Sequence, residues 1–371
     1  MPCLNEEETV HICVWKARTF MNECGINGEV IIADNGSTDR SALLAANAGA
    51  RVVNVKNKGY GSALMGGINA ARGKYIIMAD SDDSYDFLSL MPFVEKLRLG
   101  CDFVIGNRFK QKIASNAMPF LHKYLGNPIL TFIGKSFFKS KIGDFHCGLR
   151  GFSRKAFDSL ELQTTGMEFA SEMIVKATLN KCTVSEVPVK LYPDGRSGKS
   201  HLNTWGDGWR HLRFLLLYSP RWLFLYPGLM LMLIGFGVTA WSLPNPRQTL
   251  DIHSIIFAVG ALLIGFQAVF FAVFTKSFAV HERLLLGSSK IEGLLDKISL
   301  ETLIKTGILL ILLGISGGGY LVYIWQEGTF FEWGVTVTMR IAIFSFTFMV
   351  FGFQIIFSAF FYSYLKLQVR K

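Results

Sequence analysis

Hydrophobic and polar positions divide the chain into two unlike halves. Up to about residue 198, short apolar runs alternate with charged residues and glycines, whereas long apolar stretches dominate from residue 222 onward. Four of these stretches approach or exceed the ~20 apolar residues that a helix needs to cross a bilayer. They are residues 222–243, 254–278, 303–325 and 341–364. The pattern predicts a globular domain followed by an α-helical membrane domain of four spans.

The first half has the spacing of an α/β domain. Short runs rich in β-branched residues predict strands at residues 29–33, 51–55, 74–79, 102–106 and 183–189. Helix-like segments lie between them at residues 41–48, 62–71, 88–99 and 171–179. Strands that alternate with helices favour a Rossmann-like, mainly parallel sheet, in which ligands bind beyond the carboxyl ends of the strands.

Basic residues set the expected orientation in the membrane. Eight Lys or Arg residues lie between the second and third spans or after the fourth, against two in the other two linkers. Because basic loops stay on the cytoplasmic side, both termini and the globular half are expected in the cytoplasm. Basic residues beside a membrane also account for much of the net charge of +10, so no nucleic acid is expected as a partner.

Two segments are candidates for helices at the membrane surface. Residues 205–213 mix Trp with cations just before the first span, as interfacial helices do. Residues 119–141 repeat apolar side chains at helical spacing among lysines, and the alternative there is an ordinary core helix. We therefore expect a globular domain at residues 1–200, a juxtamembrane helix at 201–221 and the membrane domain at 222–371.

Polar residues follow three of the predicted strands. The first group begins at Asp34, the second contains Asp80, Asp82 and Asp83, and the third ends with Arg108. Three carboxylates within four residues repel one another unless a cation joins them, and hard oxygen ligands suit Mg²⁺ or Mn²⁺. The alternative is a solvated acidic turn.

These motifs together resemble a known family. They are PCLNE at residues 2–6, DNGSTD at 34–39, DSD at 80–82, GNR at 106–108, DFHCGLRGF at 144–152 and RSGKS at 196–200. The ordered set is similar to that of the family 2 inverting glycosyltransferases with the GT-A fold. Within that family it resembles the dolichyl- and polyprenyl-phosphate hexose synthases. The resemblance covers roughly residues 1–215 and implies a metal-dependent glycosyltransferase anchored in a membrane.

The resemblance also implies roles for individual residues. The nucleotide sugar would be bound by Pro2, Leu4, Glu6, Asp34, Asp80, Ser81 and Asp82. Asp80 and Asp82 would hold Mg²⁺ or Mn²⁺, with Ser84 at a position where some relatives have Gln as a further ligand. The acceptor phosphate would be bound by Arg108, Arg196 and Lys199. Asp82, Arg108, Asp144 and Arg150 would stand at or near the reacting centre as catalytic residues.

Two further departures from the family pattern stand out. Met1 occupies the last position of the family's opening strand, so most of that strand is expected to be missing. Leu149 replaces the more usual Phe, which we interpret as a change in packing.

The reaction implied is transfer of a hexose from a nucleoside-diphosphate sugar to undecaprenyl or dolichyl phosphate, with inversion to a β-linked lipid phosphosugar. UDP-glucose is the first expectation for the donor, GDP-mannose the second and a UDP-N-acetylhexosamine the third. The acceptor phosphate is already anionic, so no strong general base is needed. The expected location is the plasma membrane of a prokaryote, and the layout is compatible with a homo-oligomer.

Two alternatives are less favoured. A processive polysaccharide synthase would carry a QxxRW motif, but Tyr218 stands where Gln should precede Arg221 and Trp222. A transporter or flippase with a regulatory nucleotide-sugar domain would need ionisable residues within its spans, and the four stretches hold almost none near their centres.

Overall fold

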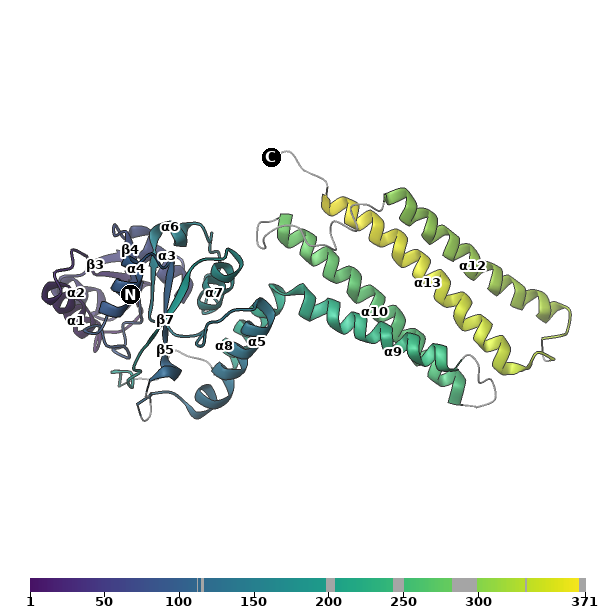
Figure 1. Cartoon of the computed structure of the whole chain (residues 1–371), viewed down its shortest axis with the longest axis horizontal. Helices are drawn as coiled ribbons and strands as arrows, with labels where there is room; N and C mark the ends of the chain where they lie inside the picture. Colours follow the sequence, from purple (N-terminus) through teal and green to yellow (C-terminus); the bar gives the residue numbers. More distant parts are fainter. Residues whose placement is uncertain are drawn as a thin grey trace. The chain divides into compact units, whose positions relative to one another are not determined.

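The computed structural model describes residues 1–111, 113–114, 117–197, 204–242, 250–281, 299–330 and 332–366. The chain divides into two compact units, Met1–Leu215 and Leu216–Lys371 (Figure 1). The division falls inside helix α8 (Thr204–Leu217). Lys199 lies outside the described residues, as do six of the basic residues used for the orientation: Arg247, Arg283, Lys290, Lys297, Arg370 and Lys371.

The described residues of the first unit form two small sheets. The first is parallel, with strand order β1 (Pro2–Cys3), β2 (Ile31–Asp34) and β3 (Arg51–Asn54). The second has the order β4 (Tyr75–Met78), β6 (Arg150–Ser153), β5 (Phe103–Asn107) and β7 (Val184–Pro188). All five predicted strands are present. The expectation of a mainly parallel sheet holds for the first sheet and for β5 with β7.

Strand β6 is the exception in the second sheet, where β4, β5 and β7 run in the same direction. It runs antiparallel to both β4 and β5, so this sheet is mixed. The sequence of β6, RGFS, lacks the β-branched residues that mark a strand, which is why the pattern did not predict it. Its position matters for the site, because β6 continues directly from the 144–149 segment.

Strand β1 lies at the edge of the first sheet, and Met1 extends its contact with β2. The Met1 amino group donates to the Ile31 carbonyl at 2.9 Å, and β1 spans only two residues. Beside Met1, a mainly apolar cavity of about 520 Å³ lies between β2 and β4.

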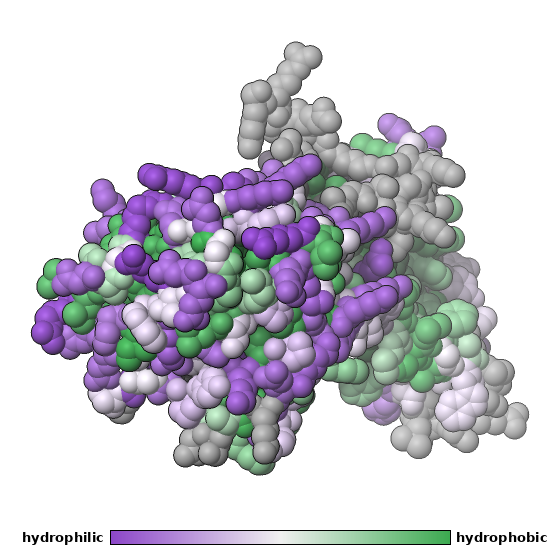
Figure 2. All heavy atoms as spheres, turned by 60° about the vertical axis from the view of Figure 1, so that its left-hand side comes forward, coloured by the Kyte–Doolittle hydropathy of each residue, from purple (hydrophilic) through white to green (hydrophobic). Residues whose placement is uncertain are grey.

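Helices cover the sheets on two sides. They are α1 (Val10–Glu23), α2 (Ser41–Asn47), α3 (Tyr60–Ala70), α4 (Met91–Arg98), α5 (Asn127–Phe138), α6 (Arg154–Asp158) and α7 (Phe169–Leu179). Side chains alternate along β4: Ile76 and Met78 join the core with α3, α6 and α7, whereas Tyr75 and Ile77 join the core with α1 and α4. The near surface of this unit in Figure 2 is mostly hydrophilic, with hydrophobic side chains between.

Two helices of the first unit expose apolar side chains. On α8, Trp205 and Trp209 point outward, while Phe214 and Leu215 are buried. A π-helical turn, His122–Gly126, leads into α5, and much of the apolar surface of this pair is exposed. The exposed side chains include Leu121, Tyr124, Leu125, Ile129 and Phe132, so a fully packed core helix does not describe the segment.

The second unit consists of long apolar helices. A π-helical turn, Arg221–Leu225, leads into α9 (Tyr226–Ser242), followed by α10 (Leu250–His281), α12 (Leu300–Gln326) and α13 (Gly334–Lys366). Among the residues that the structure describes in this unit, four helices are long and apolar enough to cross a membrane, in agreement with the four predicted spans. The paired helices approach closely at glycines: a Cβ on Gly228 would lie 2.8 Å from the Gly265 carbonyl oxygen, and one on Gly307 would lie 2.8 Å from that of Gly352. Small residues at such crossings are typical of helix packing in membranes.

Candidate functional site

The PCLNE segment is fastened to the turn that follows β2. Asn5 adopts a left-handed backbone (φ 56°), and its side-chain oxygen accepts a hydrogen bond from the Thr38 amide at 2.8 Å. The Asn5 amide in turn donates to the Ser37 hydroxyl at 3.0 Å. Asp34, at the end of β2, accepts from the amides of Gly36 and Ser37 at 3.3 and 3.2 Å. Pro2 and Glu6 are buried, whereas Leu4 is exposed.

The turn after β4 presents two carboxylates rather than three. Asp80 accepts a hydrogen bond from the Tyr60 hydroxyl at 2.8 Å, and Asp82 accepts from the amide and hydroxyl of Ser84 at 3.1 and 2.6 Å. Asp83 has a left-handed backbone (φ 59°) and pairs instead with Lys16 at 2.7 Å. The predicted metal-binding cluster therefore reduces to Asp80 and Asp82, with Ser84 orienting Asp82.

Neighbouring segments hold these carboxylates in place. The Ser81 hydroxyl donates to the Pro2 carbonyl at 2.7 Å, which links this turn to the PCLNE segment. Gly148 lies directly against Asp80: a Cβ on this glycine would come within 2.5 Å of a carboxylate oxygen of Asp80. The CGLR segment (residues 147–150) thus needs glycine at position 148 in order to approach the carboxylates of Asp80 and Asp82.

Burial and mutual repulsion make this region unfavourable for negative charge. Burial, together with the Asp82 carboxylate, raises the pKa of Asp80 to about 6. Burial also raises the pKa of Glu6 to about 7. The nearby Arg196 guanidinium lowers this pKa, but burial has the larger effect, and repulsion from Asp82 and Asp80 adds to it. A cation placed between these groups would relieve the repulsion.

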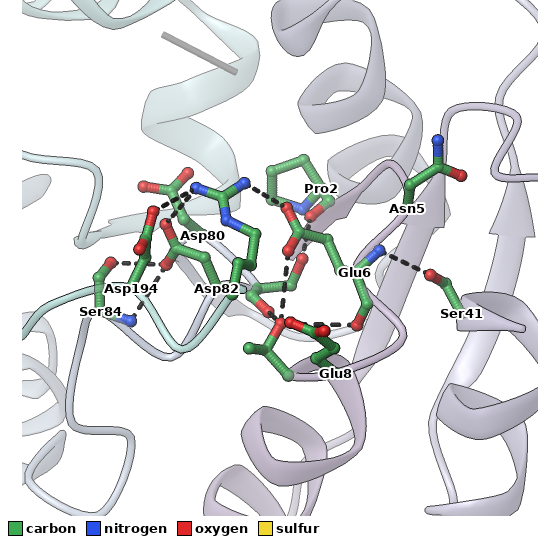
Figure 3. A network of polar contacts seen from close by, with 12 residues as sticks. Pro2, Asn5, Glu6, Glu8, Ser41, Asp80, Asp82, Ser84 and Asp194 are labelled. Atoms are coloured by element: carbon green, nitrogen blue, oxygen red, sulfur yellow. Dashed lines mark hydrogen bonds and ion pairs between the residues drawn. The ribbon is translucent and has the colours of Figure 1, made fainter. Parts of the chain in front are cut away.

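Arg196 supplies such a cation from a distant part of the chain. Its guanidinium contacts Glu6 at 2.9 Å, Asp194 at 2.9 Å and Asp82 at 3.5 Å. Figure 3 shows the carboxylates of Glu6, Asp82 and Asp194 turned toward one guanidinium. Asp194 was not predicted as a site residue. Its position two residues before Arg196 could have indicated an ion pair between the two.

Arg108 and Asp144 form a buried ion pair with two parallel hydrogen bonds. The Arg108 Nε–Asp144 Oδ2 distance is 2.7 Å, and the Nη2–Oδ1 distance is 2.8 Å. The carboxylate also accepts from the backbone amides of Arg108 and His146, each at 3.2 Å. The end of β5 is thereby fixed to the segment that precedes β6, and the two predicted residues are brought together.

Arg150 is enclosed by backbone carbonyls of the segment before β6 and of α7. Its side chain is fully buried, and it donates to the carbonyls of Phe145, Cys147 and Ala170 at 2.8, 2.8 and 2.6 Å. Backbone carbonyls therefore engage this guanidinium, and its role near the reacting centre stays a prediction. Its contacts join the 145–147 segment to α7.

Tyrosines complete the site. Tyr60, whose hydroxyl binds Asp80, comes from the glycine-rich start of α3. The Tyr85 hydroxyl accepts from the Gly148 amide at 3.0 Å and so connects the acidic turn to the CGLR segment. Neither was predicted, since nothing in the local sequence distinguishes a tyrosine of this kind from a core residue. Within the described ranges, no group of three or more His, Cys, Asp or Glu side chains is placed to hold a metal by itself.

Comparisons with known proteins agree with this architecture. Residues 1–161 match glycosyl transferase family 2, and residues 273–366 match the glycosyltransferase family 2 C-terminal transmembrane region. A low-salt glycan biosynthesis hexosyltransferase, Agl6, of Haloferax volcanii is 35% identical over 97% of this chain and 86% of its own length. A dolichyl-phosphate hexose transferase of the same organism is 27% identical over 48% of this chain and 76% of its own length.

Among solved structures, glucosyl-3-phosphoglycerate synthase from Mycobacterium tuberculosis in complex with phosphoglyceric acid covers 58% of this chain and 76% of its own, with a TM-score of 0.47 and 20% identity. The family match and the near full-length relative confirm the resemblance seen in the motifs. The chain therefore belongs to glycosyltransferase family 2, as a glycosyltransferase with a GT-A α/β domain and a C-terminal membrane region.

Proposed function

We propose that this enzyme transfers a hexose from a nucleoside-diphosphate sugar to a polyprenyl phosphate, with inversion at the anomeric carbon. The observation that carries the proposal is the pair Asp80 and Asp82 at the end of β4, in a family 2 domain followed by four membrane-type helices. The names of two relatives, a hexosyltransferase and a dolichyl-phosphate hexose transferase, support a hexose and a lipid acceptor. UDP-glucose is the preferred donor in this proposal, and GDP-mannose the second.

The acidic pair fits a hard divalent cation. Two adjacent carboxylates, one with a raised pKa, suit Mg²⁺ or Mn²⁺, and diphosphate oxygens would complete the coordination. When bound there, such an ion would stabilise the departing diphosphate as a Lewis acid. Ser84 would hold Asp82 in position through its hydroxyl rather than bind the metal itself.

The remaining site residues would bind and orient the substrates. Pro2, Leu4, Glu6, Asp34 and Ser81 would form the pocket for the nucleotide, with Asp34 near the base. Arg108, oriented by Asp144, and Lys199 would attract the acceptor phosphate. Arg196, which contacts Asp82, would bind phosphate of the acceptor or of the donor. The phosphate oxygen is an anionic nucleophile, so positioning and electrostatics would supply most of the catalysis. Arg150 would act as a support for the segment that carries Asp144.

The membrane region and the exposed apolar helices suggest where in the cell the sugar transfer takes place. We propose that the first unit lies in the cytoplasm, at the inner face of a prokaryotic plasma membrane. Trp205 and Trp209 on α8 would lie in the lipid interface, as would the exposed face of α5. The biased distribution of Lys and Arg supports this orientation.

A vesicle assay tests the function and the orientation together. Inverted membrane vesicles containing undecaprenyl or dolichyl phosphate should convert externally added radiolabelled UDP-glucose or GDP-mannose into label that extracts into organic solvent. Sealed right-side-out vesicles should do so only after permeabilisation. Label that appears in polymer would favour a processive synthase, and label that crosses the membrane unchanged would favour a transporter.

Metal affinity should depend on pH through Asp80. Because its pKa is about 6, a proton must leave Asp80 before a metal binds at lower pH, whereas the carboxylate is already ionised at higher pH. As the pH rises toward the pKa of Asp80, the dissociation constant for Mn²⁺ should therefore fall by up to about tenfold per pH unit. Above the pKa it should level off. Electron paramagnetic resonance of free Mn²⁺ measures this directly. A flat profile across the pKa would contradict the assignment of Asp80 as a ligand.

A further inference from the structure

Residues 192–197 form a loop that contacts the acidic turn after β4. The Tyr192 amide donates to the Ser84 carbonyl at 3.0 Å, and the Gly195 amide donates to the Asp82 carbonyl at 2.9 Å. Beyond Arg196, the Ser197 amide donates to the Glu8 carboxylate at 2.6 Å. The loop is thus anchored to the acidic turn on one side and to the start of α1 on the other.

The guanidinium that this loop carries is the partner of several carboxylates at once. The Arg196 side chain is only 13% exposed and contacts Glu6, Asp82 and Asp194. Asp80 and Asp82 also repel Glu6, so at least four carboxylates share the field of one guanidinium. Arg196 therefore offsets part of the negative charge of the site.

The two oxygens of Asp82 are both in use. Oδ1 accepts from Ser84, and Oδ2 faces the Arg196 Nη2 at 3.5 Å. This contact is the longest of the three that Arg196 makes with carboxylates. A divalent ion that binds Asp82 through Oδ2 competes with the guanidinium for this oxygen. Arg196 moves away from Asp82 more readily when it finds another anion to contact.

We propose that Arg196 is an internal cation that holds the donor site closed to free metal and yields Asp82 when metal and nucleotide arrive together. The nucleotide diphosphate gives the guanidinium a new anionic partner, which compensates for the contacts it leaves. Metal alone offers no such partner. The inference rests on the proposed metal site, and it adds that Arg196 makes metal binding conditional on the nucleotide.

Mn²⁺ binding to the full-length protein in detergent tests this without any turnover. The variant Arg196→Gln, without nucleotide and at one pH above the pKa values of Asp80 and Glu6, should bind Mn²⁺ about tenfold more tightly than the wild type, since a competing charge is gone. With UDP or GDP present the advantage should disappear or reverse, because the wild-type guanidinium then contacts the diphosphate. Electron paramagnetic resonance of free Mn²⁺ gives both constants.

Lys16→Gln is the matched control. It removes one positive charge that pairs with Asp83 in the same acidic turn, but Lys16 does not contact Asp82 or Glu6. Its effect on Mn²⁺ affinity should stay within about twofold, as for a partly exposed ion pair. If Lys16→Gln tightens Mn²⁺ binding as much as Arg196→Gln does, the effect is general electrostatics and the proposal is wrong.

Glu8→Ala provides a second variant, in case loss of Arg196 destabilises the acidic cluster. It removes the anchor at Ser197 and leaves Arg196 and its carboxylates intact, so Mn²⁺ binding without nucleotide should tighten to an intermediate degree. Unchanged Mn²⁺ affinity in both Arg196→Gln and Glu8→Ala overturns the inference. If no variant binds Mn²⁺ even with nucleotide, the metal site itself fails, which is a distinct result that overturns the inference as well.

Discussion

Asp82→Asn should lower the rate of sugar transfer by about 1,000-fold or more while the protein remains folded. A neutral amide is a poor ligand for Mg²⁺ or Mn²⁺. Loss of the Lewis acid raises the free energy of the transition state by several kcal/mol. The change should have little effect on folding, because it removes one carboxylate from a group that already repels Glu6 and Asp80. Label recovered in the lipid extract measures the rate, and thermal unfolding checks the fold.

Asp83→Asn is the control that the structure offers. Asp83 belongs to the same acidic turn but pairs with Lys16, and Asn tolerates its left-handed backbone. This variant should retain activity within about fivefold of the wild type, the range expected for loss of a partly exposed ion pair. An equal loss of activity in both variants would show that the turn is merely an acidic surface and that Asp82 has no special part.

Removal of the metal from the wild type should lower the rate of transfer as Asp82→Asn does. EDTA should abolish transfer, and Mn²⁺ or Mg²⁺ in excess should restore it. Full turnover in the presence of the chelator would contradict the role proposed for Asp80 and Asp82.

The elements that the sequence predicted are those whose pattern is local. Strands β2, β3, β4, β5 and β7 carry β-branched runs, and the four membrane helices carry apolar stretches, so each could be recognised within its own segment. Strand β6 could not, because its sequence is not strand-like and its pairing depends on β4 and β5, which lie earlier in the chain. The mixed character of the second sheet depends on this one strand.

The site shows the same division. Asp80 and Asp82 were found because both stand in one short motif, whereas the contact of Arg196 with Glu6 joins residues 190 positions apart. The resemblance implies a catalytic role for Arg150, but a motif does not show whether an arginine contacts a phosphate or backbone carbonyls. Its burial and its hydrogen bonds to carbonyls appear only in the fold. Asp83 belongs to the predicted group of three carboxylates, but its left-handed backbone and its ion pair with Lys16 depend on contacts that the motif does not show.

Breaking the Arg108–Asp144 pair should affect both stability and activity. Asp144→Asn leaves Arg108 buried without its ionic partner, which costs about 3–5 kcal/mol in comparable cases. For a unit of this size the melting temperature should fall by about 10 °C. Transfer should also fall sharply, because Arg108 loses the two hydrogen bonds that orient it. Thermal unfolding and initial rates on the folded fraction measure the two effects separately.

The double variant Arg108→Gln with Asp144→Asn separates a catalytic role from a structural one. With both charges removed, two amides can bond to each other, and much of the lost stability should return. Activity should stay low if Arg108 attracts the acceptor phosphate. If activity returns together with stability, the pair only supports the fold.

A second buried ion pair gives a matched comparison. Lys176 and Glu172 on α7 lie 2.8 Å apart and are as buried as Arg108 and Asp144. Lys176→Gln should also lower the melting temperature, because the buried Glu172 carboxylate loses its cation and keeps hydrogen bonds from Gln163 and Thr164. The rate per folded molecule should change little, since this pair lies outside the proposed site. An equal loss of rate in Lys176→Gln and Asp144→Asn would mean that destabilisation alone, rather than the orientation of Arg108, accounts for the effect of Asp144.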